Sequence, residues 1–270
     1  MPADEVDRHV LIDGLQIRYR VEGEGPPLLL LQGIGGSLEL WEPLLCQLRD
    51  VRTAIVYDHP GSGASDRPRM PVPMGFYATV ARKLLERLGF ERADVLGFSF
   101  GGMAAQELAR TSPGSVERLV LIGTSCGWGA VPGRPLAVVG LVHPLRYYSS
   151  RYFKLIAPIM YGGTLTTDSD LVRGQAAVRL KRPPSVIGYY LQLLAVWTWS
   201  SRPWLRQIRA RTLVISGLDD PLAVSANGRM LAREIPNAEL LEIPHAGHLL
   251  PVESAADMAP RLRAFLATPS

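Results

Sequence analysis

The pattern of apolar and polar residues predicts strands that alternate with helices along most of the chain. Two alternating segments meet at Asp13-Gly14 in HVLIDGLQIRYRVEG, which predicts an antiparallel hairpin at the start. Six later stretches are apolar almost throughout, which is typical of strands buried on both faces of a parallel sheet. They are residues 27–33, 53–58, 93–98, 117–123, 211–217 and 238–243. Helices are expected near residues 38–49, 76–88, 99–111, 224–235 and 254–267.

The alternation is interrupted once, after Thr124. The Gly/Pro-rich stretch GWGAVPGRP begins there, and helix-like segments rich in aromatic residues continue to about residue 205. We therefore expect an α/β fold whose mostly parallel sheet begins with an antiparallel hairpin and carries an inserted helical lid. The expected core is residues 1–125 and 206–270, and the expected lid is residues 126–205.

Composition narrows the class of protein. With 270 residues, 47% of them hydrophobic and 20% charged, the chain is long enough for one globular core with an insertion. Cys46 and Cys126 form neither a disulfide framework nor a metal site by their spacing. The start, MPADEVDRHV, lacks the features of a signal peptide, and no apolar run is long enough to span a bilayer. A cytoplasmic protein without a transmembrane segment is expected.

The net charge of +4 raises the question of nucleic-acid binding, but no basic block interleaved with aromatic residues is present, so none is expected. The charge is uneven, because residues 127–205 hold nine basic and two acidic residues, or +7. That excess would attract anionic ligands such as organic acids. The alternative is an ordinary solvated face.

Two serines satisfy the pattern Gly-x-Ser-x-Gly, and their contexts differ. Ser99 follows an apolar strand and precedes the helix-forming MAAQELAR, so Gly97 and Gly101 would permit a sharp turn that exposes its hydroxyl. Ser125 is followed by glycines and prolines that cannot continue a helix. Ser99 is therefore the predicted nucleophile and Ser125 a structural residue. The alternative for Ser99 is a small residue at a tight turn.

A nucleophilic serine needs an imidazole base that is oriented by a carboxylate. The loop IPHAGHLLPVES after the last strand offers His245 and His248, of which His248 is the predicted base and His245 a loop partner. Asp219 and Asp220 both follow an earlier strand, and either one would supply the carboxylate that orients the imidazole. The alternative is that both residues only form a turn and cap the next helix. Backbone N–H groups of Ile34 and Phe100 are the candidate donors to an oxyanion.

With these features in place, residues from about 10 to 266 resemble an α/β-hydrolase. The stretches QGIGGSLELW, VPGRP, LIAPIMYGG, GYYLQLLAVWTW and IPNAELLEI resemble intracellular depolymerases of medium-chain poly(3-hydroxyalkanoates). The resemblance implies that Ser99, Asp220 and His248 form the triad, that Asp220 rather than Asp219 is the acid, and that no metal or organic cofactor takes part. It also implies an acyl-enzyme, a small or polymeric 3-hydroxyacyl ester as substrate and an intracellular setting. Together with the positive charge of residues 127–205, it makes a polyester granule surface or a coenzyme A thioester a candidate partner.

Two departures from that family concern the acyl pocket. Gln32 stands where relatives usually have Asn or His, and Phe100 stands where the depolymerases tend to have Trp. Aromatic residues of the lid would roof an apolar cleft, although most of them would serve equally to pack the lid on the core. The residues expected to line the pocket are Gln32, Gly33, Trp128, Met160, Tyr161 and Leu249.

Other functions remain open on the same triad. A small-molecule carboxylesterase, an acyl thioesterase and a carbon–carbon bond hydrolase would share the fold and the three residues, because the pocket decides the chemistry. A ligand-binding protein on a hydrolase fold is the alternative from a different class. The sequence makes no prediction of oligomeric state.

Overall fold

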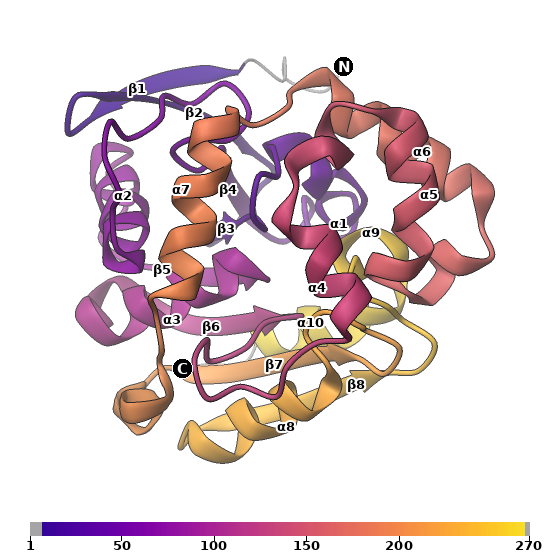
Figure 1. The fold of residues 1–270 in the computed structure, drawn as a ribbon. Coiled ribbons are helices and arrows are strands. Elements are labelled where there is room, and N and C mark those ends of the chain that lie inside the picture. The colour runs from indigo at the N-terminus through magenta and orange to yellow at the C-terminus, as the bar shows by residue number, and fades with distance from the viewer. Residues whose placement is uncertain (1–6, 268–270) are drawn as a thin grey trace.

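The central feature of the structure is one eight-stranded sheet in the order β1-β2-β4-β3-β5-β6-β7-β8 (Figure 1). The computed structural model describes residues 7–267. Strand β2 pairs antiparallel with β1 and β4, and every other neighbouring pair is parallel. The strands are β1 Arg8–Ile12, β2 Leu15–Glu22, β3 Pro27–Leu31, β4 Thr53–Tyr57, β5 Ala93–Phe98, β6 Val116–Ile122, β7 Arg211–Gly217 and β8 Ala238–Ile243. The predicted mostly parallel sheet with an antiparallel hairpin is confirmed.

Both faces of the sheet are covered, which explains why its strands are apolar throughout. In β3, Leu28 and Leu30 pack into one core, whereas Leu29 and Leu31 pack into the other. Side chains of a strand point alternately to its two faces, so a strand between two cores needs apolar residues at every position. The helices that cover the sheet are α1 Glu42–Leu45, α2 Met74–Arg87, α3 Phe100–Thr111, α8 Ser225–Glu234, α9 Leu250–Glu253 and α10 Ala255–Ala267.

The helix expected over residues 38–49 is the main error in the predicted elements. The chain instead forms a 3₁₀ turn, Leu38–Trp41, followed by the single helical turn of α1. Pro43 lies in the first turn of α1, where its missing N–H is tolerated. Because proline lacks the N–H that continues a helix from the preceding turn, Pro43 favours the start of a new helical turn here.

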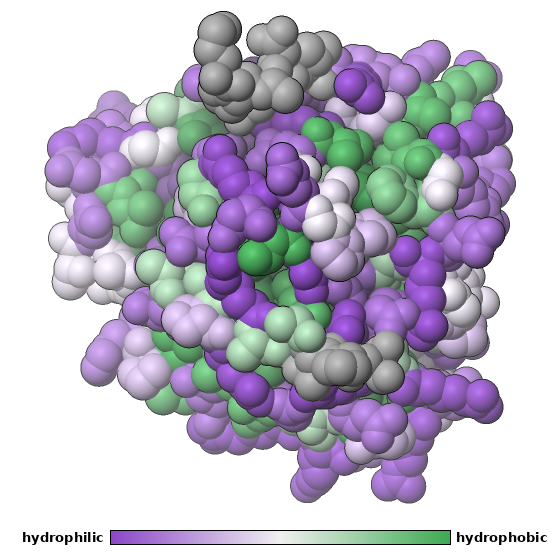
Figure 2. All heavy atoms as spheres, turned by 180° about the vertical axis from the view of Figure 1, so that it is seen from behind, coloured by the Kyte–Doolittle hydropathy of each residue, from purple (hydrophilic) through white to green (hydrophobic). Residues whose placement is uncertain are grey.

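Four α-helices lie between β6 and β7, in the segment that was predicted as a lid. They are α4 Pro135–Val142, α5 Ser150–Tyr161, α6 Ser169–Lys181 and α7 Val186–Trp197. Polar residues cover most of the molecular face shown in Figure 2, where apolar residues form small separate groups. Helices α4, α5 and α7 nevertheless carry exposed large apolar side chains, namely Leu136, Val138, Val139, Leu155, Ile159, Val186, Ile187, Tyr190, Leu194 and Trp197. Among the described residues, no helix is both long and apolar enough to cross a membrane.

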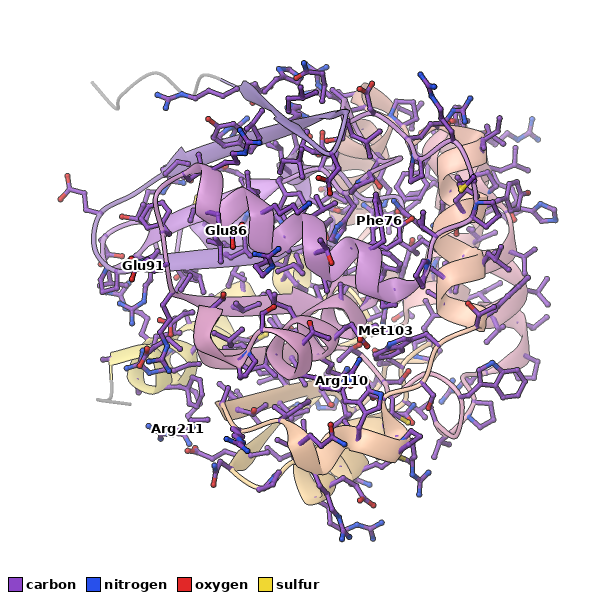
Figure 3. All side chains as sticks on the ribbon, turned by 90° about the vertical axis from the view of Figure 1, so that its left-hand side faces the viewer. Phe76, Glu86, Glu91, Met103, Arg110 and Arg211 are labelled. Atoms are coloured by element: carbon purple, nitrogen blue, oxygen red, sulfur yellow. The ribbon has the colours of Figure 1, made fainter. Side chains whose placement is uncertain are left out.

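Helix α3 anchors the end of the inserted segment. Figure 3 looks onto α2 and α3, with Met103 and Arg110 labelled on α3. The Arg110 guanidinium lies 4.7 Å from the centre of the Trp204 ring. Glu107 Oε2 accepts a 2.8 Å hydrogen bond from Trp199 Nε1. The helix that follows Ser99 therefore also fixes the point at which the chain returns to the sheet.

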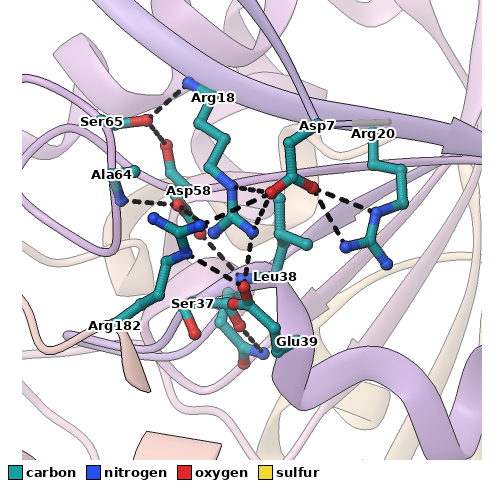
Figure 4. A network of polar contacts seen from close by, with 11 residues as sticks. Asp7, Arg18, Arg20, Ser37, Leu38, Glu39, Asp58, Ala64, Ser65 and Arg182 are labelled. Carbon is teal, nitrogen blue, oxygen red and sulfur yellow. Dashed lines mark hydrogen bonds and ion pairs between the residues drawn. The ribbon is translucent and has the colours of Figure 1, made fainter. Parts of the chain in front are cut away.

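A buried ionic network holds together the loops on one side of the sheet (Figure 4). Arg18 on β2 is 1% exposed and binds three carboxylates. Its Nη1 lies 3.0 Å from Asp58 Oδ2, and its Nη2 lies 2.5 Å from Glu39 Oε1 and 2.6 Å from Asp7 Oδ2. Arg182, at the end of α6, reaches the same Glu39 at 3.5 Å. The network thus connects the hairpin, the loops after β3 and β4, and the inserted segment.

His59, which follows β4, is buried against the same loops. Its Nε2 lies 3.0 Å from the backbone oxygen of Gln32, and its ring contacts the ring of Phe100 edge-on at 5.2 Å. Burial lowers the pKa of His59 from 6.5 to about 3, because a charged imidazolium would lose its hydration there.

Removing the central cation of the network should destabilise the fold. We expect Arg18→Met to lower the free energy of unfolding by about 3–5 kcal/mol, because Asp58 would stay buried without its partner. Urea denaturation measures the change. Arg8→Met, on the exposed part of the neighbouring strand, should change it by less than about 0.5 kcal/mol. Equal effects of the two substitutions would contradict the assigned role of the network.

His59 should make the protein sensitive to acid. As the pH falls below 6.5, the unfolded chain binds a proton at this residue that the folded chain does not bind until about pH 3. Stability that is present above pH 6.5 is therefore lost in this window, by at most about 1.4 kcal/mol per pH unit. Urea denaturation between pH 7.5 and 4.5 should show a shallower loss for His59→Gln than for the wild type. Parallel curves would rule out this contribution.

Candidate active site

Ser99 occupies a sharp turn between β5 and α3. Its backbone has φ 53° and ψ −116°, a conformation that L residues rarely adopt. The turn requires glycine on both sides, because a Cβ at Gly101 would lie 2.0 Å from the Leu31 oxygen and one at Gly97 would lie 2.4 Å from the Gly101 oxygen. The close approach of α3 to β3 thus places the Ser99 hydroxyl at the carboxyl edge of the sheet, beside the first turn of a helix.

The structure brings together the three side chains predicted to act as nucleophile, base and acid. His248 Nε2 lies 3.1 Å from Ser99 Oγ, and His248 Nδ1 lies 2.8 Å from Asp220 Oδ2. Asp220 and His248 are only 4% and 5% exposed. This arrangement allows the imidazole to take a proton from the serine while the carboxylate fixes its orientation and tautomer.

The geometry separates the two neighbouring aspartates. Asp220 Oδ1 accepts hydrogen bonds from the backbone N–H groups of Leu222 and Ala223, which leaves Oδ2 for His248. Asp219 is more than half exposed and lies 3.9 Å from the exposed His245. Of the two carboxylates, only Asp220 is aimed at His248.

Ser125, in the second Gly-x-Ser-x-Gly match, lies in a different environment. Its backbone oxygen accepts a bond from Gln106 Nε2 at 3.1 Å, and its hydroxyl accepts one from the Gly127 N–H at 3.3 Å. Within residues 7–267, no histidine contacts its hydroxyl. These bonds hold the start of the inserted segment.

Ile34, in the loop after β3, lines the same cavity as Ser99. Within the described chain, neither the backbone N–H of Ile34 nor that of Phe100 at the start of α3 has a hydrogen-bond acceptor. Gln192 on α7 holds the loop, because its Oε1 accepts from the Gly35 N–H at 2.8 Å. The Tyr147 hydroxyl donates to the Ile34 oxygen at 2.6 Å. The loop is therefore fixed from the inserted segment.

Gln192 makes two further bonds. It is fully buried, and its Nε2 donates to the Pro60 oxygen and to Ser62 Oγ, both at 3.0 Å. One side chain of α7 therefore fixes the loop after β3 against the loop after β4.

A cavity of about 30 Å³ lies beside Ser99, with room for one or two water molecules. Five of the residues expected in the pocket line it, namely Gln32, Gly33, Met160, Tyr161 and Leu249. Trp128 does not line it, and this expectation is corrected. Its side chain is 71% exposed and borders a separate hollow with Ser125 and Met103. Gly127 and Gly129, both with positive φ, turn the chain there toward the surface.

The inserted segment also contacts His248. The Tyr161 ring is parallel to the His248 imidazole, with 6.1 Å between the ring centres. The backbone oxygen of Tyr161 accepts a 2.6 Å hydrogen bond from the backbone N–H of His248. Glu253 holds the adjacent turn, because it accepts from the Gly247 N–H at 3.0 Å and from the Thr164 N–H at 2.8 Å. Burial raises the pKa of Glu253.

Four side chains that shape this site were not found from the sequence: Gln192, Glu253, Arg146 and Arg179. The two arginines line the cavity and are 1% and 3% exposed. The sequence offered one signal for them, the positive charge of the segment, but charge counting does not distinguish buried from solvated arginines. Across the described residues, no group of three or more His, Cys, Asp or Glu is placed to hold a metal ion.

Comparison with known proteins agrees with this architecture. Residues 26–255 match the family described as alpha/beta hydrolase fold. The chain is 37% identical over 269 residues to a poly(3-hydroxyalkanoate) depolymerase of Ectopseudomonas oleovorans, covering 98% of this chain and 94% of that protein. It is 26% identical over 248 residues to a 2-hydroxy-6-oxo-6-phenylhexa-2,4-dienoate hydrolase of Burkholderia cepacia, covering 88% and 86%.

A solved structure agrees over the whole length. The crystal structure of a hydrolase from Pseudomonas aeruginosa PA01 superimposes with a TM-score of 0.83 at 27% identity, covering 98% of this chain and 100% of that one. The sheet order, the turn at Ser99 and these similarities lead to one conclusion. The chain belongs to the α/β-hydrolase fold family and is a hydrolase.

Proposed function

We propose that this hydrolase cleaves medium-chain 3-hydroxyacyl esters, polymeric or oligomeric, through an acyl-enzyme on Ser99. The observation that carries the proposal is the chain of hydrogen bonds from Ser99 through His248 to Asp220. The similarity to a poly(3-hydroxyalkanoate) depolymerase over 98% of the chain supports the choice of substrate.

The proposed reaction follows from the positions of these groups. His248 Nε2 takes the Ser99 proton as Oγ attacks the ester carbonyl, and Asp220 stabilises the imidazolium. The N–H groups of Ile34 and Phe100 donate to the oxyanion. The imidazolium then protonates the departing alkoxide, and water, deprotonated by His248, releases the acid from Ser99. The reaction needs no metal or organic cofactor.

We further propose that residues 126–205 act as a lid over the core formed by residues 1–125 and 206–270. The cavity beside Ser99 has room for only one or two water molecules, and movement of the inserted helices would enlarge it for a medium-chain acyl group. The exposed apolar side chains of α4, α5 and α7 would suit contact with a polyester granule. A cytoplasmic location fits this role and the two free cysteines.

The second Gly-x-Ser-x-Gly serine provides a matched control for the nucleophile. We expect Ser99→Ala to lower kcat on the oligomers of 3-hydroxyoctanoate by at least about 10³-fold, because the acyl-enzyme cannot form. Ser125→Ala should retain kcat within about twofold. Release of 3-hydroxyoctanoate, measured by chromatography, together with labelling by a fluorophosphonate probe, tests both. Wild-type turnover by Ser99→Ala would overturn the assignment.

The neighbouring aspartates provide a second matched pair. Asp220→Asn should lower kcat by about 10³- to 10⁴-fold, because the amide cannot stabilise the imidazolium and favours the wrong tautomer. Asp219→Asn should leave kcat nearly unchanged, since its side chain faces solvent. The same chromatographic assay measures both variants. A larger loss in the Asp219 variant would refute the assignment of the acid.

The polymer itself distinguishes the substrate classes. Release of soluble product from purified 3-hydroxyoctanoate polymer by the wild type would support a depolymerase. Cleavage confined to simple esters, thioesters or the carbon–carbon bond of a dienoate would keep the triad and move the protein to another hydrolase class.

A further inference from the structure

Arg146 and Arg179 are buried cations that face the same cavity as Ser99 and His248. Arg146 lies in the turn before α5, and Arg179 lies near the end of α6. Both come from the inserted segment, so two separate elements direct guanidinium groups toward the site of the proposed reaction.

Within residues 7–267, neither guanidinium forms an ion pair. Arg146 Nη1 donates to the backbone oxygens of Leu141 and His143, at 3.4 and 3.1 Å. Arg179 Nη1 donates to the Gln175 backbone oxygen at 3.2 Å and to Gln175 Oε1 at 2.6 Å. In that part of the chain, Nε of each arginine is buried without an acceptor. The Arg146 guanidinium also interacts with the side chains of Tyr147 and Tyr189.

Aromatic rings hold both guanidinium planes in place. The Arg146 guanidinium carbon lies 4.8 Å from the centre of the Tyr147 ring and 5.0 Å from that of Tyr189. The corresponding distances for Arg179 are 4.9 Å to Phe153 and 5.6 Å to Tyr161. Cation–π contacts offset part of the lost hydration of a buried cation, and they orient the planar fork.

The contrast with Arg18 shows what is missing at this site. Arg18 is equally buried, but it binds Asp7, Glu39 and Asp58. Arg146 and Arg179 have donors of the same kind, but no carboxylate of residues 7–267 pairs with either, although burying a charge without a counter-charge is unfavourable. A protein that places two such groups in one cavity is preorganised for an anionic ligand. A carboxylate matches the planar fork, because its two oxygens accept parallel N–H bonds.

We propose that Arg146 and Arg179 form a subsite for a free carboxylate of the substrate. This inference rests on the proposed function, in which the substrate is an ester of 3-hydroxy acids, whose chain ends in one carboxylate. Because the arginines and Ser99 line one small cavity, the carboxylate lies only a few bonds from the ester that is cleaved. The preferred substrates are therefore short oligomers that are hydrolysed next to their carboxyl end, to a 3-hydroxy acid and a shortened acid.

The test compares two forms of one substrate. The linear dimer of 3-hydroxyoctanoate is assayed as its free acid and as its N-methylamide, which lacks the charge and keeps a single ester bond. The wild type should cleave the acid with a kcat/KM about 10- to 100-fold above that of the amide. Arg146→Met and Arg179→Met should each lower the ratio of kcat/KM for the acid to kcat/KM for the amide to less than about threefold, and this ratio cancels any effect that the two substrates share.

Arg173→Met is the matched control, because Arg173 lies on the same helix as Arg179 but is exposed and paired with Asp170. It should keep the full preference for the acid. Equal cleavage of acid and amide by the wild type would overturn the subsite, as would loss of the preference in the Arg173 variant. A second pair of substrates, monoethyl suberate and diethyl suberate, differs by a carboxylate in the acyl half of the ester. A preference for the charged compound that is found only in this pair would also overturn the proposal.

A binding measurement separates this proposal from the proposed function. Ser99→Ala protein is titrated with the dimer acid or its amide, and the midpoint of thermal unfolding is recorded. The acid alone should raise the midpoint, and adding Arg146→Lys, which keeps the charge but loses the fork, should reduce the shift. If the acid binds but the wild type cleaves neither compound, the subsite stands and the proposed reaction fails. Equal shifts for acid and amide would refute the subsite even where turnover is normal.

Discussion

The close packing of α3 against β3 is the constraint on which the site depends. There is no space for a side chain at Gly101, because the Leu31 oxygen occupies it. The close packing of α3 on β3 forces a positive φ at Ser99. This sharp turn of the backbone fixes the direction of the Ser99 hydroxyl. The sheet supplies the rigidity that keeps such a conformation, since β5 is hydrogen-bonded on both sides by parallel neighbours.

Residues of the inserted segment directly contact the loop and the histidine of the site. Tyr147 and Gln192 hold the loop that carries Ile34, and Tyr161 packs on His248. Arg182 joins the ionic network of the hairpin. Residues that are distant in sequence therefore set the positions of the groups proposed to act on the substrate.

The sequence was sufficient for the sheet and for the grouping of Ser99 with His248, because apolar periodicity and the order of the elements depend on local pattern. It could not separate Asp219 from Asp220, which follow the same strand, and only the turn after β7 aims one of them at His248. Trp128 was misplaced because apolar character does not reveal the direction of a loop. The sequence did not place Arg146 and Arg179 in the site, because charged residues are normally expected at the surface. Only the tertiary packing buries these two.

The hydrogen bonds of Gln192 couple the position of α7 to the positions of the loops after β3 and β4. A motion of α7 away from the core would break its bonds to Gly35, Pro60 and Ser62 together. Under the proposed lid motion, the loops after β3 and β4 would therefore lose this shared support while α7 is displaced. Under the same proposal, cleavage follows the return of α7, so a ligand that keeps α7 displaced would bind without being cleaved.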